Sequence, residues 1–368
     1  MFYTRPRAGY GASMADWTLL GPKIPVPVWR KQLLRAVGFD DGAIVWAPMR
    51  GSWDDLDADR LPSDARTLLL LHGTGMITRP GFHGFTEGEF DELWRRYEGR
   101  ILAFEHQALQ RALPTNARAL SGSLLAGGVR LHLDILGLSR GGLLGRYLAE
   151  GWAEAMLSDR VTIDKLVFLG TPNGGTPSAR RDPLGAGARE MKAWRTDVRR
   201  VALIGDPDRE VEEVEDPFTL DRYEPADRYL TWPMFRGTID QLPGSTMLRK
   251  LNGFAGPAPG QRWRDRPPRY YGIAAVFTFD HGAPDPVLVG GQKPLRRSEV
   301  ARWALPVPND LVVPTRSVYA PLQGPDASGL FPLIRERLLV LAPTANATHT
   351  GLMRLGAVRR RIVSWLLG

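Results

Sequence analysis

The segment LHLDILGLSRGGLLGRYLAEG, residues 131–151, constrains the fold more than any other stretch of the chain. Its first five residues alternate apolar and polar side chains, a pattern typical of a β-strand. Beyond Ser139 the large apolar side chains recur at helical spacing, at Leu143, Leu144, Tyr147 and Leu148. The junction is a G-x-S-x-G formed by Gly137, Ser139 and Gly141. A strand that turns sharply into a helix at a serine predicts that this serine lies at the carboxyl end of the strand, where open α/β sheets bind ligands.

From residue 66 onward, strand-like and helix-like segments alternate along the chain. This alternation predicts an α/β fold with a mostly parallel central sheet and helices on both faces. The expected strands are the apolar runs at 66–73, 100–106, 131–137, 165–172, 270–279 and 337–343. Further helices are expected at 86–99, where Thr86 and Glu89 form a capping box, at 116–125 and at 351–368.

The same alternation suggests how the chain is divided. Residues 66–172 and 265–368 are expected to form the α/β core. Residues 173–264 interrupt the alternation with many prolines, glycines and charges, so we expect an insertion over one face of the sheet. Residues 1–65 contain the strand-like pieces WTLLG and AIVWAPM, which we expect as antiparallel edge strands.

A serine hydroxyl is a weak nucleophile, so Ser139 needs a base to accept its proton and an acid to orient that base. The chain has six histidines. His349 lies between the last expected strand and the last helix, where the order serine, acid, histidine of this architecture puts the base. His281 is the alternative base.

The acid is expected in the loop PNDLVVPTRS, at Asp310. Asp280 and Asp285 remain alternatives because both closely follow an expected strand. A purely structural role for Asp310, in an Asx turn after Asn309, also stays open.

The stabilisation of an oxyanion requires backbone N–H groups aimed at the developing charge. His72-Gly73-Thr74-Gly75 directly follows the first expected parallel strand. We assign one donor to the amide of Thr74 and the other to the amide of Arg140, the residue after the serine. Gly137 and Gly141 are expected to permit the tight turn. A plain glycine turn is the structural alternative for the Thr74 segment.

Five motifs, LLLLHGTG, ILGLSRGG, LVFLGTPNGGT, NDLVVPTRS and THTGL, occur in the order found in lipase-like α/β hydrolases, and the chain resembles that superfamily from residue 66 to 368. SRGGLLGRYLAE and LPGSTMLRKLN resemble more narrowly a bacterial hydrolase domain that is sometimes joined to CHAT (caspase-like) proteases. The resemblance implies a triad of Ser139, Asp310 and His349, a lid at 173–264 and no cofactor. Leu138 departs from the pattern, since many lipases carry histidine before the serine.

Composition argues against several other classes. The net charge of +8 comes from scattered arginines and forms no basic stripe, so we expect no nucleic-acid partner. No apolar run is long enough for a transmembrane segment, and the N-terminus lacks the pattern of a secretory signal, so we expect a cytoplasmic protein. With 0 cysteines there is no thiolate metal site, and the acidic run DPDREVEEVED lacks the glycine of an EF-hand loop.

Together these features predict a serine hydrolase that cleaves a carboxylic ester, esterase- or lipase-like, with a small-molecule or lipid ester as substrate. The same triad would serve a thioesterase, an amidase or an acyltransferase. A non-catalytic binding module with this fold is the alternative outside the enzymes. Protein partners are left open.

Overall fold

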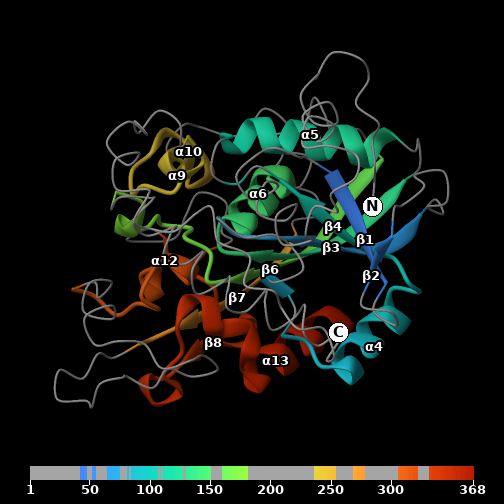
Figure 1. Ribbon diagram of the computed structural model, residues 1–368. Coiled ribbons are helices and arrows are strands. Elements are labelled where there is room, and N and C mark those ends of the chain that lie inside the picture. The colour runs from blue at the N-terminus through green and yellow to red at the C-terminus, as the bar shows by residue number, and fades with distance from the viewer. Residues whose placement is uncertain are drawn as a thin grey trace, which may run out of the picture.

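The computed structural model describes residues 42–47, 52–54, 64–74, 81–82, 84–106, 108, 111–126, 130–150, 160–180, 236–253, 268–277, 306–321 and 331–368. In these ranges an eight-stranded sheet runs through the molecule in the order β2-β1-β4-β3-β5-β6-β7-β8 (Figure 1). The strands are β1 (Gly42–Ala47), β2 (Ser52–Asp54), β3 (Ala65–Leu71), β4 (Ile101–Glu105), β5 (Leu131–Leu138), β6 (Val161–Leu169), β7 (Arg269–Ala275) and β8 (Leu338–Leu341).

The six strands β3 to β8 pair in parallel, whereas β1 pairs antiparallel with both β2 and β4. The sequence AIVWAPM therefore contributes an antiparallel strand, and WTLLG lies outside the described residues. The carboxyl ends of the central strands lie level, because Gly137 of β5 stands opposite Leu71 of β3 and Phe168 of β6. Loops that leave these strands consequently meet at one edge of the sheet.

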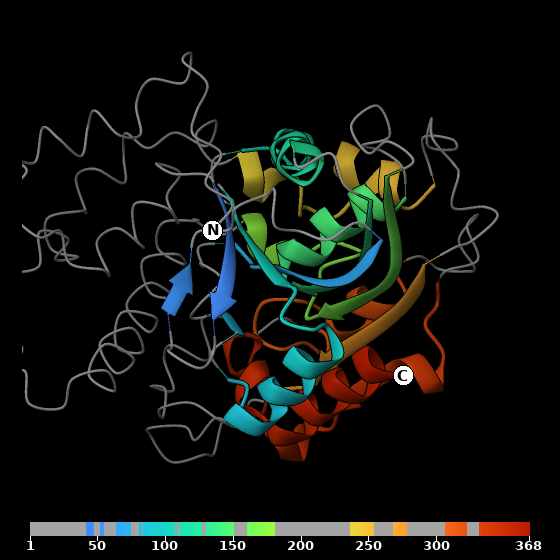
Figure 2. The ribbon, with the colours of Figure 1, turned by 90° about the vertical axis from the view of Figure 1, so that its right-hand side faces the viewer.

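Helices cover both faces of the sheet (Figures 1 and 2). One face carries α5 (Leu113–Ala126), α6 (Arg140–Ala149) and α10 (Thr246–Leu251), whose apolar side chains share one buried cluster with the strands. The opposite face carries α4 (Glu87–Arg96) and α13 (Gly356–Leu367), which contribute to a second cluster. Short helices α9 (Arg236–Ile239) and α12 (Thr315–Tyr319) complete the α-helices described. None of the helices in the ranges given above has the length and apolar character needed to cross a membrane.

The strand–turn–helix unit predicted around Ser139 is present at the centre of the sheet. β5 leads through Ser139 directly into α6, and β5 lies between β3 and β6. A mostly parallel sheet with a serine at a sharp strand-to-helix turn is the architecture of the α/β-hydrolase fold. The predicted fold class is therefore confirmed.

Most element predictions differ from the structure only at their ends. The capping box of Thr86 and Glu89 opens α4 as expected. The helix expected at 116–125 begins earlier, at Leu113, because the carboxylate of Asp240 accepts a 2.6 Å hydrogen bond from the Leu113 amide. His349 was expected in a loop and instead begins a 3₁₀ helix, His349–Arg354, so the last α-helix starts at Gly356 rather than at residue 351.

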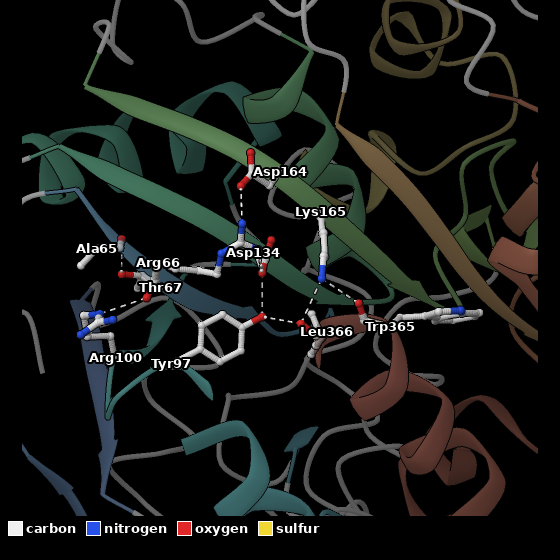
Figure 3. A network of polar contacts seen from close by, with 10 residues as sticks. All are labelled: Ala65, Arg66, Thr67, Tyr97, Arg100, Asp134, Asp164, Lys165, Trp365 and Leu366. Carbon is white, nitrogen blue, oxygen red and sulfur yellow. Dashed lines mark hydrogen bonds and ion pairs between the residues drawn. The ribbon is translucent and has the colours of Figure 1, made fainter. Parts of the chain in front are cut away.

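The face of β5 that carries Asp134 is buried, as is the opposite face with Leu133 and Ile135. Asp134 is fully buried, because α4 and α13 cover the face on which it lies. Its carboxylate accepts hydrogen bonds from the Tyr97 hydroxyl at 2.7 Å and from Arg66 at 3.1 Å (Figure 3). Arg66 also reaches Asp164, at 3.0 Å. Burial raises the pKa of the Asp134 carboxyl, and these donors oppose that shift.

Lys165 of β6 is buried close to Asp134. Its ammonium donates to the backbone carbonyls of Trp365 at 2.9 Å and Leu366 at 3.0 Å, at the end of α13 (Figure 3). A cation at a helix C-terminus satisfies carbonyls that lack intrahelical partners and interacts favourably with the helix dipole. Burial lowers the pKa of Lys165, whereas the nearby Asp134 raises it. This contact fastens the C-terminal helix to the centre of the sheet.

Candidate active site

Ser139 lies in the sharp turn between β5 and α6, with 5% of its surface exposed. Its backbone angles, φ 53° and ψ −125°, fall in a region that residues other than glycine rarely adopt. Such a conformation is strained by about 1–3 kcal/mol and persists only where surrounding contacts impose it. Here the Ser139 amide donates to the Leu169 carbonyl at 2.8 Å, and the Ser139 carbonyl accepts from the Gly142 amide at 3.0 Å.

The turn depends on close backbone approach. A methyl group added at Gly141 would lie 2.1 Å from the Leu71 carbonyl oxygen, and one added at Gly137 would lie 2.5 Å from the Gly142 backbone. At Gly142, an added methyl group would lie 2.0 Å from the Thr171 hydroxyl oxygen. The first turn of α6 is therefore packed directly against the ends of β3 and β6.

Asp310 and His349 are hydrogen-bonded to each other. Nδ1 of His349 lies 2.8 Å from Oδ2 of Asp310, and both side chains are buried. A backbone hydrogen bond from the His349 amide to the Asp310 carbonyl, also 2.8 Å, holds the two residues in register. The carboxylate keeps the imidazole proton on Nδ1, so Nε2 is the basic nitrogen of the ring.

Asp310 also takes part in the turn that follows Asn309. The Asn309 side-chain oxygen accepts from the Leu311 amide at 2.6 Å, while Oδ1 of Asp310 accepts from the amides of Val312 at 3.0 Å and Val313 at 2.7 Å. One carboxylate oxygen thus orders the loop and the other holds His349. These backbone donors fix the carboxylate independently of the histidine.

Gly170 connects His349 to the Ser139 turn. Gly170 directly follows Leu169, the residue whose carbonyl accepts from the Ser139 amide. A methyl group added at Gly170 would lie 2.9 Å from both Nδ1 and Cε1 of His349, so the imidazole packs against the Gly170 backbone. The sheet consequently brings the serine, the imidazole and the carboxylate to the same edge.

The two residues assigned as oxyanion donors lie beside this turn. Arg140 is the first residue of α6, and the N–H groups of a helix's first turn have no intrahelical acceptor. Thr74 lies three residues beyond the end of β3, whose last carbonyl is in close contact with Gly141. The His72–Thr74 turn and the N-terminus of α6 are therefore neighbours.

The other described histidines have structural contacts. His72 shares a hydrogen bond with the Gly73 carbonyl and accepts one from the His106 amide, and the rings of His72 and His106 stack at 4.0 Å. His132 lies at the opposite end of β5, 3.9 Å from Asp64. The alternatives His281, Asp280 and Asp285 lie outside the described residues, as does His83. In the part of the chain described, no three side chains of His, Asp or Glu gather as a metal site, and the acidic run 206–216 is outside that part.

The chain matches one known protein family along most of its length. The model of the family described as a domain of unknown function (DUF7379) matches residues 40–367. The chain belongs to this family. No curated protein matches the DUF7379 chain.

The chain is similar to solved structures that include a lipase, a meta-cleavage product hydrolase and MenH. The lipase BlEst2 of Bacillus licheniformis has 13% identity and a TM-score of 0.43, over 84% of this chain and 94% of that one. The meta-cleavage product hydrolase of Pseudomonas fluorescens has 14% identity and a TM-score of 0.39, over 83% and 91%. MenH of S. aureus has 11% identity and a TM-score of 0.32, over 84% and 94%.

Sequence reasoning missed two side chains of the DUF7379 chain that contact the expected oxyanion residues. Asp240 forms an ion pair with Arg140, and Gln241 donates to the Thr74 hydroxyl oxygen. Both lie in the expected lid insertion, immediately before the LPGSTMLRKLN segment that carried part of the family resemblance. The resemblance of this motif to a known hydrolase domain indicated that the region matters, but it did not indicate which residues Asp240 and Gln241 contact.

The close contact at Gly141 gives a direct test of the turn. Gly141→Ala is expected to lower the free energy of unfolding by at least about 2 kcal/mol, since the added methyl group meets backbone atoms that cannot move aside. The control is Gly122→Ala, in the middle of α5, where nothing lies within 4 Å of the added carbon. That variant is expected to be more stable by roughly 0.5–1 kcal/mol, because alanine has the higher helix propensity. Urea unfolding followed by circular dichroism measures both, and equal effects would contradict the packing described here.

Proposed function

We propose that this chain is a serine hydrolase that cleaves a carboxylic ester through Ser139, His349 and Asp310. The observation that carries the proposal is the 2.8 Å contact between His349 Nδ1 and Asp310 Oδ2, made by a ring that packs on Gly170 beside the Ser139 turn. A buried acid–imidazole pair next to a strained, glycine-flanked serine is the arrangement that nucleophilic acyl transfer requires.

In the first half of the reaction, Ser139 Oγ attacks the ester carbonyl carbon as its proton moves to His349 Nε2. The tetrahedral intermediate collapses, the bond from carbon to the alcohol oxygen breaks, and the imidazolium returns the proton to that oxygen. In the second half, water attacks the acyl-serine while Nε2 accepts its proton. As this second intermediate collapses, the bond from the acyl carbon to Ser139 Oγ breaks, the imidazolium returns its proton to Oγ, and the carboxylic acid is released. Asp310 fixes the imidazole tautomer and stabilises its positive charge in both halves.

The negative charge that develops on the carbonyl oxygen needs donors already in place. The amides of Thr74 and Arg140 are assigned to it, because the first is in the turn after β3 and the second opens α6. Two amides held by rigid elements need no rearrangement when the charge appears, which is how such sites lower the barrier.

The substrate is proposed to be a small-molecule or lipid ester with an apolar acyl group, and the protein to be cytoplasmic and bacterial. Kinship with the hydrolase domain of CHAT-linked proteins is part of the same proposal and is supported by the motifs quoted above. Thioester, amide and acyl-transfer chemistry would use the same residues and differ in the acceptor or leaving group.

Reaction with a fluorophosphonate probe tests the proposal. The parent protein is expected to be labelled stoichiometrically, and Ser139→Ala, which retains the fold but lacks the hydroxyl, is expected to be unlabelled. A set of p-nitrophenyl esters of increasing chain length then reports acyl preference. A well-folded parent that resists the probe and hydrolyses none of the esters would overturn the enzyme proposal in favour of a binding module.

A further inference from the structure

Two consecutive residues of the 236–253 segment contact the two expected oxyanion residues. Gln241 donates from Nε2 to the Thr74 hydroxyl oxygen at 2.9 Å. Asp240 Oδ2 accepts from the Arg140 guanidinium at 3.3 Å. The Gln241 and Arg140 side chains are buried, which makes loss of either contact costly.

Asp240 is held by more than the ion pair. Oδ2 also accepts the 2.6 Å hydrogen bond from the Leu113 amide at the start of α5. The same Arg140 nitrogen that meets Asp240 donates to the Arg111 carbonyl at 2.7 Å. Arg140 is thereby tied through its side chain both to the loop before α5 and to Asp240. Burial raises the pKa of Asp240, and the Arg140 charge opposes this rise.

The backbone that carries Asp240 and Gln241 is itself anchored. Ser245, the N-cap of α10, donates from its hydroxyl to the Asp240 carbonyl at 2.9 Å. The Thr176 amide donates to the Gln241 carbonyl at 2.8 Å, and the Thr176 hydroxyl donates to the Val312 carbonyl. The Val312 amide in turn donates to Oδ1 of Asp310. A continuous set of hydrogen bonds therefore links the acid loop, the 236–253 segment and both expected oxyanion residues.

We propose that Asp240 and Gln241 are positioning residues that set the separation of the Thr74 and Arg140 amides. This inference rests on the proposed function. An oxyanion donor acts only within about 2.7–3.1 Å of the oxygen it stabilises, so a small displacement of either amide weakens the transition state more than the bound substrate. The two contacts come from neighbouring residues of one anchored loop and end on the side chains of Thr74 and Arg140, so they restrain the separation of these two residues.

The test compares Gln241→Met, which keeps the side-chain length but removes the donor, with Asp240→Asn, which keeps an acceptor for the Leu113 amide but removes the charge. Each is expected to lower kcat for a p-nitrophenyl ester roughly tenfold, a fraction of the loss seen when an oxyanion donor is deleted outright. KM is expected to change less than about twofold, because the bound substrate carries no negative charge on its carbonyl oxygen and depends little on the amides of Thr74 and Arg140. Thr246→Ala, an exposed position of the same segment, is the control and should match the parent.

Two further measurements distinguish positioning from a general loss of structure. Affinity for a trifluoromethyl ketone with the same acyl chain, whose adduct with the serine carries an oxyanion, should fall by the same roughly tenfold factor as kcat. The pH profile of kcat/KM should not change, since the imidazole and its carboxylate are untouched. Thr74→Val breaks the Gln241 contact from the other side and keeps the backbone amide, so Gln241→Met should add nothing in that background.

The outcomes separate this proposal from the one on which it rests. A parent that fails to react with fluorophosphonate overturns both. A reactive parent whose Gln241→Met and Asp240→Asn variants keep full kcat and full ketone affinity overturns the positioning role alone. If Asp240→Asn does not fold, Gln241→Met and Thr74→Val decide, and additive losses in their double variant would contradict the proposed coupling.

Discussion

Ser139→Ala and His349→Ala are each expected to reduce kcat by about 10⁶-fold, and the double variant is expected to be no worse than either. The losses do not add because the hydroxyl is useless without a proton acceptor, and the imidazole has no proton to accept without the hydroxyl. Residual hydrolysis above the rate in water should persist, because the amides of Thr74 and Arg140 and the substrate contacts remain. Single-turnover hydrolysis of a p-nitrophenyl ester at high enzyme concentration measures such small rates.

His132→Ala is the matched control for this experiment. His132 belongs to the same strand as the serine but lies at its opposite end, half-exposed beside Asp64. Its removal should leave kcat unchanged. Multiplicative losses in the double variant would mean that the serine and the imidazole act in separate steps, and the triad proposal would then be wrong.

Asp310→Asn is expected to reduce kcat by roughly 10⁴-fold at neutral pH. In the asparagine variant the side-chain oxygen can still accept from the Val312 and Val313 amides, so the loop keeps its shape. The amide nitrogen then faces His349 and donates to Nδ1, which moves the imidazole proton to Nε2. Because Nε2 must be unprotonated to accept the serine proton, the site is assembled in the wrong tautomer.

Asp164→Asn provides the comparison, since the partly exposed Asp164 contacts Arg66 in the first half of β6, whereas His349 packs on Gly170 beyond the end of that strand. It should retain the parent rate. Asp280→Asn tests the alternative acid predicted from the sequence, and a 10⁴-fold loss there, with Asp310→Asn unaffected, would transfer the role to Asp280.

The part of the fold that depends on local sequence could be predicted. The turn at Ser139 is determined by neighbouring glycines and by a change from strand to helix periodicity, both within 21 residues. The capping box at Thr86 is likewise local. Asp310 and His349 could also be identified as candidates from the sequence. Their 2.8 Å contact depends on how the loops around β8 fold, so the sequence could suggest it but not establish it.

Features set by distant partners could not be predicted. The start of α5 depends on Asp240, 127 residues away, and the Thr74 contact comes from Gln241, 167 residues away. The alternation in β5 places Asp134 on the face opposite Leu133 and Ile135 and carries no information about which helices cover that face. Only the tertiary structure supplies Tyr97 and Arg66 as its partners.

The attachment of Lys165 to the end of α13 has a consequence for synthesis on the ribosome. Lys165 is made 200 residues before Trp365, the first of its two carbonyl acceptors. At translation rates of about 5–20 residues per second, the nascent chain spends roughly 10–40 s with β6 complete and those acceptors not yet made. During that interval the ammonium lacks the two carbonyl acceptors that it has in the folded protein, so its burial would cost free energy. The late synthesis of α13 therefore disfavours native packing of this face before the chain is nearly complete.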